Sequence, residues 1–333
     1  MKLLVTGGAG FVGSNFIHLI LAERPDWEVV NLDKLTYAGN LDNLRGIEND
    51  PRYRFIKGDI CRADDVETAA KGCDAIVNFA AETHVDRSIL APMAFLETDM
   101  IGTYVLLEAV REGRAERLLQ VSTDEVYGSI AEGAADERYS VRPSSPYSAS
   151  KTGADLLALS YWHTYHTPVS ITRGANNIGP YQYPEKVLPL FITNALDDIP
   201  LPLYGDGLQV RDYTHVEDHC RGILLALEEG EPGEVYNVGA GNEMRNIDMA
   251  QFILAEIGKP ETLIKHVKDR PGHDRRYAVD CGKLRALGWE PRYGATEALR
   301  STVRWYAENR WWWEPIKSGD RYREYYRRQY EDR

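Results

Sequence analysis

The sequence predicts an α/β protein built on a doubly wound parallel sheet, with a smaller C-terminal α/β lobe. Two observations predict this fold. Short β-branched and apolar runs alternate with amphipathic helical patterns through the first half of the chain, which is typical of parallel βαβ units. A glycine-rich turn, TGGAGFVG, directly follows the first of these runs and leads into a helical pattern.

The elements of the first half can be read in order. The predicted strands span residues 2–6, 28–33, 54–58, 75–80, 117–122 and 169–173. The clearest helical patterns between them cover residues 93–112 and 148–166. From about Asn176 prolines are frequent and the regular alternation of strand and helix patterns ends. Helical patterns return near 216–229, 246–257 and 295–309.

We therefore expect a first domain over residues 1–175, with 208–242 returning to its sheet, and a second lobe with a C-terminal tail over 176–333. The tryptophan run at 311–313 is interpreted as packing of that lobe rather than as a binding motif. The charged and aromatic tail RYREYYRRQYEDR is expected to be solvated or loosely docked.

Composition excludes several function classes. The chain has 333 residues and a formal net charge of −12, which argues against nucleic acid as a partner. Its four cysteines are scattered without a CxxC pair, so we expect neither a disulfide framework nor a bound metal. The first apolar run is too short for a signal peptide, and no run approaches membrane-spanning length. We expect a cytoplasmic enzyme that does not bind a membrane.

The glycine-rich turn has the spacing Gly8-x-Gly10-x-x-Gly13 of a dinucleotide fingerprint. Asp33 ends the next predicted strand, where its carboxylate can bind a ribose 2′-hydroxyl and would repel a 2′-phosphate. The cofactor expected in this Rossmann-type domain is NAD rather than NADP, although Lys34 weakens that choice. A glycine turn without a ligand is the alternative. Asp59 is either an adenine-side contact or a plain turn residue.

Tyr147 and Lys151, in PYSASK, lie one helical turn apart on the same face of a predicted helix. A phenol with a pKa of about 10 is a poor base at neutral pH, but a nearby ammonium and a nicotinium ring favour the phenolate. We therefore expect Tyr147 to act as a base. Thr123, at the end of the neighbouring strand, could bind the same substrate hydroxyl.

Two adjacent carboxylates, Asp124 and Glu125, follow an apolar strand in STDEVYGS. Buried carboxylates cost much free energy unless they are paired or used. A base and an acid in different environments can divide the work of an elimination. The alternative is that the two side chains form ordinary ion pairs or caps near a loop.

Together TGGAGFVG, Asp33, NFAAETHVDRS, STDEVYG, PYSASK and RPGHDRRYA resemble the extended short-chain dehydrogenase/reductase family, in particular its nucleotide-sugar 4,6-dehydratases. The resemblance covers nearly the whole chain, except about the last dozen residues. The sequence differs from the common family pattern in RGANNIGP, where many relatives carry a tyrosine at the position of Ile178 and another residue at the position of Gly174.

The resemblance implies a lyase, more precisely a hydro-lyase, of deoxysugar biosynthesis that dehydrates a nucleoside-diphosphate hexose. The favoured substrate is dTDP-glucose, and the product is then dTDP-4-keto-6-deoxyglucose. Tyr147 takes the C4 hydroxyl proton while hydride leaves C4 for NAD. Glu125 then removes the C5 proton, Asp124 protonates the departing C6 hydroxyl, and hydride returns to C6.

The resemblance also implies binding residues and a homodimer that pairs helices 93–112 and 148–166. The cofactor contacts it implies are Gly7, Gly10, Phe11, Val12, Gly13, Asp33, Lys34, Thr36, Asp59, Ile60, Ala80, Ala81, Thr83, Thr98, Tyr147, Lys151 and Asn177. The substrate contacts it implies are Thr83, His84, Asn176, Lys186, Val187, Pro202, Tyr204, Arg211, Asn237, Arg270 and His273.

Two other functions stay open. A sugar-nucleotide 4-epimerase or decarboxylase on the same scaffold would keep Tyr147 and Lys151 but would give Asp124 and Glu125 no chemical task. A non-catalytic dinucleotide sensor would tend to lose the Tyr147 and Lys151 pair, which this chain retains.

Overall fold

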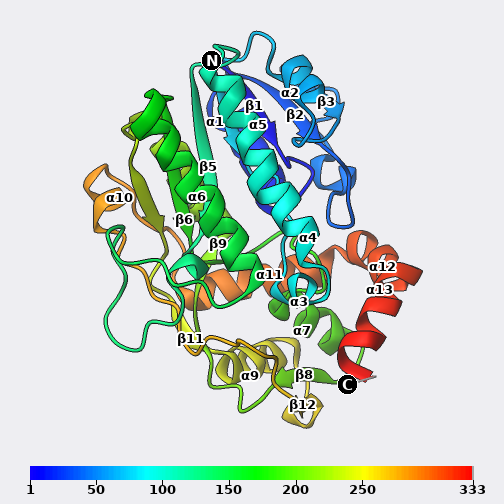
Figure 1. Cartoon of the computed structure of the whole chain (residues 1–333). Coiled ribbons are helices and arrows are strands. Elements are labelled where there is room, and N and C mark those ends of the chain that lie inside the picture. Colours follow the sequence, from blue (N-terminus) through cyan, green and yellow to red (C-terminus); the bar gives the residue numbers. More distant parts are fainter. Residues whose placement is uncertain (332–333) are drawn as a thin grey trace.

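The centre of the computed structural model, which describes residues 1–331, is a seven-stranded sheet (Figure 1). All its strand pairs are parallel, and the strand order is β10-β6-β5-β4-β1-β2-β3. The strands are β1 (Lys2–Thr6), β2 (Glu28–Asp33), β3 (Tyr53–Lys57), β4 (Ala75–Asn78), β5 (Arg117–Thr123), β6 (Val169–Gly174) and β10 (Val235–Val238). Parallel strands bring their carboxyl ends to one edge, which places the residues after β1, β4 and β5 together.

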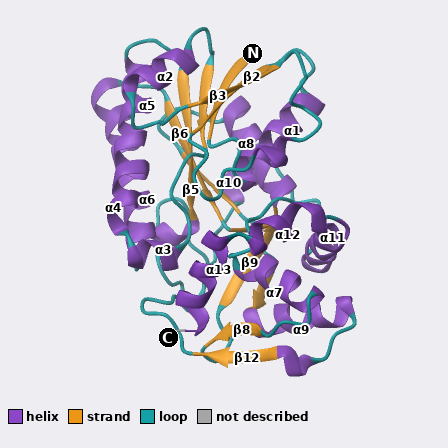
Figure 2. Ribbon diagram, turned by 90° about the vertical axis from the view of Figure 1, so that its right-hand side faces the viewer, coloured by secondary structure: helices purple, strands orange, loops and turns teal. Residues whose placement is uncertain are grey.

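Helices cover both faces of the sheet, and Figure 2 shows the two layers edge-on. On one side lie α1 (Phe11–Glu23), α8 (Val216–Glu229) and α10 (Gly282–Ala286). On the other lie α2 (Ala63–Ala70), α5 (Gly102–Arg111) and α6 (Pro146–Tyr165). Each layer buries its own apolar core against the sheet. The doubly wound parallel sheet predicted from the sequence is confirmed.

The two long predicted helices differ in regularity. The expected helix 93–112 is divided into α4 (Pro92–Phe95), a π-helical segment (Leu96–Ile101) and α5, and it follows the short α3 (Val85–Leu90). In contrast, α6 is continuous over the predicted range. Its start is fixed by a capping box, in which Ser145 and Ser148 satisfy each other's backbone N–H groups.

The second lobe has a separate apolar core. Its helices are α7 (Val187–Leu196), α9 (Asn246–Ile257), α11 (Ala295–Glu308) and α12 (Arg310–Ser318). Strands β8 (Leu201–Tyr204) and β12 (Ile264–Val267) form a parallel pair beside them. A three-stranded sheet of β7 (Asn176–Ile178), β9 (Val210–His215) and β11 (Glu243–Arg245) connects this lobe to the main sheet. Short 3-10 turns occur at Leu41–Leu44, Asp124–Tyr127 and Glu261–Leu263.

The segment 208–242 divides between the two parts. Its first strand, β9, pairs with β7 and β11 and lies outside the main sheet. The following helix α8 covers the sheet, and β10 then pairs with β6 at the edge.

The prediction of a solvated or loosely docked C-terminal tail is wrong for the described residues 321–331. Helix α13 (Asp320–Tyr326) and a π-helical turn (Arg327–Glu331) fold back onto the protein. Tyr322, Tyr325 and Gln329 are buried, and the Tyr322 hydroxyl donates to the Pro184 carbonyl at 3.1 Å. These three residues are spaced i, i+3, i+7, so they share one helical face despite the charges between them. Residues 332 and 333 lie outside the described part.

The tryptophan run packs as expected. Trp312 and Trp313 are buried in the core of the second lobe, whereas Trp311 is 41% exposed. The indole of Trp312 also donates to the Asn43 side chain at 2.7 Å, which ties this lobe to the first. Within residues 1–331, no helix combines the length and the hydropathy needed to cross a bilayer.

Candidate active site

A cavity of about 400 Å³ opens at the carboxyl edge of the main sheet and is lined by residues from both parts of the molecule. Every cofactor contact expected from the sequence lines it. Every expected substrate contact lines it as well, except Asn237. Of the expected catalytic residues, Thr123, Glu125, Tyr147 and Lys151 line the cavity, and Asp124 lies behind them in the interior.

The glycine turn after β1 makes room for a ligand at the start of α1. A Cβ on Gly13 would lie 2.5 Å from the Gly7 carbonyl oxygen and 2.9 Å from the Gly8 Cα. Gly7 itself has φ +69°, in the left-handed region that other residues avoid. The free N–H groups and the dipole at the start of α1 suit a pyrophosphate, so the residues present fit a dinucleotide.

Asp33, at the end of β2, is positioned by backbone N–H groups from Ala9 at 2.9 Å and Leu35 at 2.7 Å. Burial raises the pKa of Asp33, and these two hydrogen bonds oppose the rise. Lys34 does not remain a free cation, because its ammonium lies 2.6 Å from the Asp59 carboxylate. This pairing weakens the case for a 2′-phosphate beside Lys34 and supports NAD.

Tyr147 and Lys151 face the cavity from α6, where Lys151 donates to the Val121 carbonyl at 2.8 Å. The expected lowering of the Tyr147 pKa is not seen in this structure. Burial raises that pKa well above its ordinary value, the carboxylates of Glu125 and Asp99 add to the rise, and only the hydrogen bond with Thr123 among the main causes opposes it.

The adjacent acids Asp124 and Glu125 occupy different environments on the 3-10 turn after β5. Asp124 is 2% exposed, and its Oδ2 has no hydrogen-bond partner in the described structure. Burial raises the pKa of Asp124 well above its ordinary value, and the charge of Glu125 raises it further. A neutral Asp124 is what the expected role as an acid requires.

Glu125 faces the cavity instead. Burial raises the pKa of Glu125, but the cations Arg270, Arg211 and Lys186 oppose this rise. Burial thus raises the pKa of both carboxyl groups, but three cations oppose the rise at Glu125, whereas the charge of Glu125 adds to the rise at Asp124. Such a difference is how two carboxyl groups come to act as an acid and a base.

Those three cations converge on the substrate side of the cavity. Lys186 donates to the Thr83 hydroxyl at 3.0 Å. Arg270 pairs with Asp86 at 3.3 Å, and its buried Nε has no hydrogen-bond partner within residues 1–331. Arg211 is held by the backbone carbonyls of Val210 and Asp274. A cluster of preordered donors of this kind suits a diphosphate.

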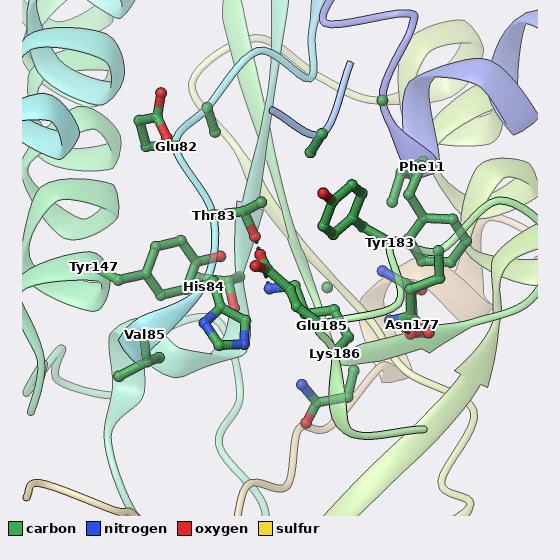
Figure 3. Close-up of a pocket in the computed structure, with 18 of the residues that line it drawn as sticks. Phe11, Glu82, Thr83, His84, Val85, Tyr147, Asn177, Tyr183, Glu185 and Lys186 are labelled. Atoms are coloured by element: carbon green, nitrogen blue, oxygen red, sulfur yellow. Dashed lines mark hydrogen bonds between the residues drawn. The ribbon is translucent and has the colours of Figure 1, made fainter. Parts of the chain in front are cut away.

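The close-up in Figure 3 shows Tyr147 and Thr83 on one side of the cavity and Tyr183 and Asn177 on the other. His84 lies near Tyr147, at the turn into α3, with a strained backbone φ of 95°. Burial lowers the pKa of His84 well below its ordinary value, so its imidazole is neutral. Backbone strain of this kind is concentrated at functional sites.

The placement of Asn237 differs from the expectation that it binds substrate. It is fully buried on β10, its amide donates to the carbonyls of Ala135 and Asp280, and its Oδ1 accepts from Tyr127. With these hydrogen bonds made inside the protein, Asn237 is a structural residue. Asn246, at the start of α9, lines the cavity instead.

The sequence reasoning missed a second layer around the cavity. Arg87 forms an ion pair with the buried Glu185 at 2.7 Å, and its guanidinium lies between the rings of Tyr37 (3.7 Å) and Tyr325 (4.5 Å). Tyr325 also lies 3.4 Å from the His84 ring nitrogen. Tyr325 is three residues after Tyr322, so both lie on one helical face. This spacing is the signal in the sequence that favours burial of the tail.

The departures from the resembled family cluster beside α8. A Cβ on Gly174 would overlap the His219 ring, which is buried, lines the cavity and has no partner for its Nδ1 among the described residues. Gly174 therefore makes room for the imidazole, and burial lowers the pKa of His219 to about 4.

Comparison with known proteins shows the family. Residues 4–302 match the family model described as GDP-mannose 4,6 dehydratase. The chain is 50% identical to a dTDP-glucose 4,6-dehydratase of Streptomyces niveus, over 96% of this chain and 97% of that protein.

Solved structures agree with this assignment. A dTDP-glucose 4,6-dehydratase from Streptomyces venezuelae with NAD bound is 51% identical, has a TM-score of 0.93 and is matched over 95% of this chain and all of that one. A UDP-glucose 4-epimerase of Thermus thermophilus in complex with NAD is 33% identical, over 93% of this chain and all of that one, with a TM-score of 0.85. Because the epimerase shares the fold, the site residues have to separate the two activities.

Proposed function

Because this chain belongs to the GDP-mannose 4,6 dehydratase family, within the extended short-chain dehydrogenases/reductases, we propose that it is an NAD-dependent hydro-lyase that converts dTDP-glucose to dTDP-4-keto-6-deoxyglucose. The observation that carries the proposal is the acid pair at the end of β5. Glu125 faces the cavity beside Tyr147, and Asp124 lies behind it, where burial raises its pKa and favours the protonated form. An epimerase has no use for either group.

The chain's own residues divide the reaction. Tyr147 accepts the proton of the C4 hydroxyl, and Thr123, to which it is hydrogen-bonded, helps to orient that hydroxyl. The resulting C4 ketone acidifies the C5 proton, which Glu125 removes. Asp124 protonates the C6 hydroxyl, so that it departs as water.

The cofactor site is formed by the glycine turn, Asp33, Asp59 and the residues after β4. NAD held there would provide the hydride acceptor for C4 and the hydride donor for C6, and its positively charged ring would favour the phenolate form of Tyr147. Lys151, anchored on the Val121 carbonyl, supplies a second positive charge from the same face of α6, one helical turn after Tyr147.

For the substrate, we assign the diphosphate to Arg211, Arg270 and Lys186, with Asn176 and Asn246 as neutral donors at the same cavity. The nucleotide base is assigned to the far end, beside Pro202 and Tyr204 on β8, where the Tyr204 hydroxyl donates to Asp86 at 3.0 Å. Val187 and His273 complete that end.

A mass measurement tests the function directly. The purified protein is incubated with dTDP-, UDP-, CDP- and GDP-linked hexoses, with and without added NAD, and the products are followed by mass spectrometry. We expect dTDP-glucose to lose one water without net formation of reduced cofactor. Unchanged mass with an altered sugar configuration would show an epimerase, and loss of carbon dioxide from a uronic acid would show a decarboxylase.

We also propose that the protein is a homodimer joined through α4, the π-helical segment, α5 and α6. Apolar side chains that would otherwise face water gather on these elements. They are Met93, Leu96, Ile101, Tyr104, Leu156 and Tyr165, which are between 42% and 63% exposed. A shared four-helix contact would cover them.

The cytoplasm is the compartment we propose. Cys61, Cys73, Cys220 and Cys281 are free thiols in the described structure, as is typical of a reducing compartment. Cell fractionation with an antibody against the protein tests this, and recovery in an oxidising compartment would contradict it.

A further inference from the structure

A tyrosine hydroxyl lies between the catalytic Glu125 and a second carboxylate. The hydroxyl of Tyr277 is 3.4 Å from Glu125 Oε2 and 2.8 Å from Asp274 Oδ2. Tyr277 is 3% exposed, and the guanidinium of Arg211 lies over its ring at 4.2 Å from the centroid. The position of this hydroxyl is therefore fixed, and it faces the active-site carboxylate.

The hydrogen bonds of Tyr277 continue through Asp274 to the protein surface. Asp274 is half-buried, and the hydroxyl of the exposed Ser144 donates a hydrogen bond to its Oδ2. The backbone carbonyl of Asp274 is held by Arg211 at 2.9 Å, which fixes the loop that carries it. Oxygen atoms thus follow one another from Glu125 through Tyr277 and Asp274 to solvent beside Ser144.

We propose that Tyr277 and Asp274 form a relay that exchanges the proton on Glu125 with solvent during the reaction. This rests on the proposed function, in which Glu125 receives the C5 proton. The protonated Glu125 donates to the Tyr277 oxygen while the phenolic proton passes to Asp274, and Asp274 releases it to water. No other bond is made or broken. The same transfers in reverse bring a solvent proton from Asp274 through Tyr277 to Glu125, which then returns it to C5.

A purely structural role makes a different prediction. If Tyr277 only orients Glu125, its removal slows the reaction but leaves the origin of the C5 hydrogen unchanged. If it carries protons, its removal traps the substrate's own proton on Glu125, which then returns it to C5. The isotope at C5 therefore separates the two roles where the rate alone does not.

The experiment runs the reaction in heavy water with dTDP-glucose and measures deuterium at C5 of the product, quenched at matched early conversion. Purified product incubated in heavy water gives the background exchange of the ketone. In the wild-type protein we expect deuterium at C5 in most turnovers. In Tyr277→Phe and in Asp274→Asn we expect the enzymatic incorporation to fall about tenfold, while product of the dehydrated mass still forms.

The matched control is Tyr236→Phe, which removes another buried tyrosine hydroxyl, 2.9 Å from the Glu231 N–H and away from the cavity. It should label C5 like the wild type. Wild-type labelling in both relay variants, or no deuterium at C5 in the wild type, overturns the relay. Absence of any dehydrated product in the wild type contradicts the proposed function instead, so the two failures are distinguishable.

Discussion

Asp124 and Glu125 are consecutive in the chain, yet the first carboxyl group is buried directly behind the cavity lining and the second faces the cavity, where Arg270, Arg211 and Lys186 act on its pKa. The turn after β5 directs the two side chains into these different surroundings. The proposed function gives each carboxyl group a different proton-transfer role, and the first two predictions below test this difference.

Glu125→Gln should allow oxidation at C4 but block water loss. The amide cannot accept the C5 proton, so the reaction stops at the reduced cofactor, and we expect dehydration to fall by about 10²–10⁴-fold. Stopped-flow absorbance of the reduced cofactor and product mass measure the two steps separately. Glu132→Gln, an exposed glutamate on the neighbouring loop, is the control. Normal water loss by Glu125→Gln would show that the base lies elsewhere.

Asp124→Asn should change the pH dependence of stability. Because the pKa of Asp124 is raised in the folded protein, the folded state holds a proton that the unfolded chain releases above about pH 3.9. The stability from this group is present at low pH and is lost as pH rises toward the folded pKa. The Tm of the variant relative to wild type should therefore increase from about pH 5 to pH 8. A constant Tm difference, measured by calorimetry in matched buffers, would contradict the raised pKa.

Gly13→Ala should abolish tight NAD binding. The added Cβ meets the Gly7 carbonyl and the Gly8 backbone, neither of which is the movable end of a side chain. We expect affinity to fall by at least about tenfold, or ~1.4 kcal/mol, in titration calorimetry. Gly294→Ala is the matched control, since a Cβ there has open space and the backbone is extended. Equal affinities of both variants would argue against a cofactor at this turn.

Tyr325→Ala should weaken sugar-nucleotide binding more than NAD binding. The substitution removes one aromatic face from Arg87 and the contact with His84, which lines the cavity. A buried cation–π contact contributes about 0.5–2 kcal/mol, so KM for the substrate should rise about tenfold. Arg323→Ala, an exposed change on the same helix, should leave KM unchanged. A larger effect on NAD affinity than on KM would contradict this assignment.

Leu156→Glu should separate the proposed dimer. The side chain is 52% exposed on α6, and a charge there would have to be desolvated in the four-helix contact. Light scattering after size exclusion should give a dimer for the wild type and a monomer for the variant. Leu41→Glu, which changes a leucine 47% exposed away from these helices, should stay dimeric. A monomeric wild type would refute the dimer.

The strands and the cofactor site could be predicted because their signals are local. The apolar runs of β1, β4 and β5 and the glycine turn are continuous in sequence, and parallel pairing carries their ends to one edge. Residues 33, 124, 147 and 151 could therefore be placed together before any coordinates were known.

Contacts between distant segments could not be predicted in this way. The pairing of Arg87 with Glu185 joins residues 98 positions apart. The residues next to each of them in the sequence do not indicate which partner it has. Asn237 stands in the apolar run VYNVG and Asn246 in MRNID, and only the fold shows that Asn246 faces the cavity while Asn237 is hydrogen-bonded inside the protein. The burial of the tail is hidden in the sequence because charged residues stand between the tyrosines that share one helical face.

Because residues 320–331 pack against the rest of the protein, they also affect the order in which the parts of the cavity form during protein synthesis. The glycine turn and all seven strands of the main sheet lie before residue 239 in the chain, whereas Tyr330, which lines the cavity, and Tyr325, which contacts His84, are synthesised after them. A nascent chain that has completed these strands still lacks this last part of the cavity wall. Catalysis on the sugar nucleotide would therefore wait until residues 320–331 have been synthesised and have packed against the protein.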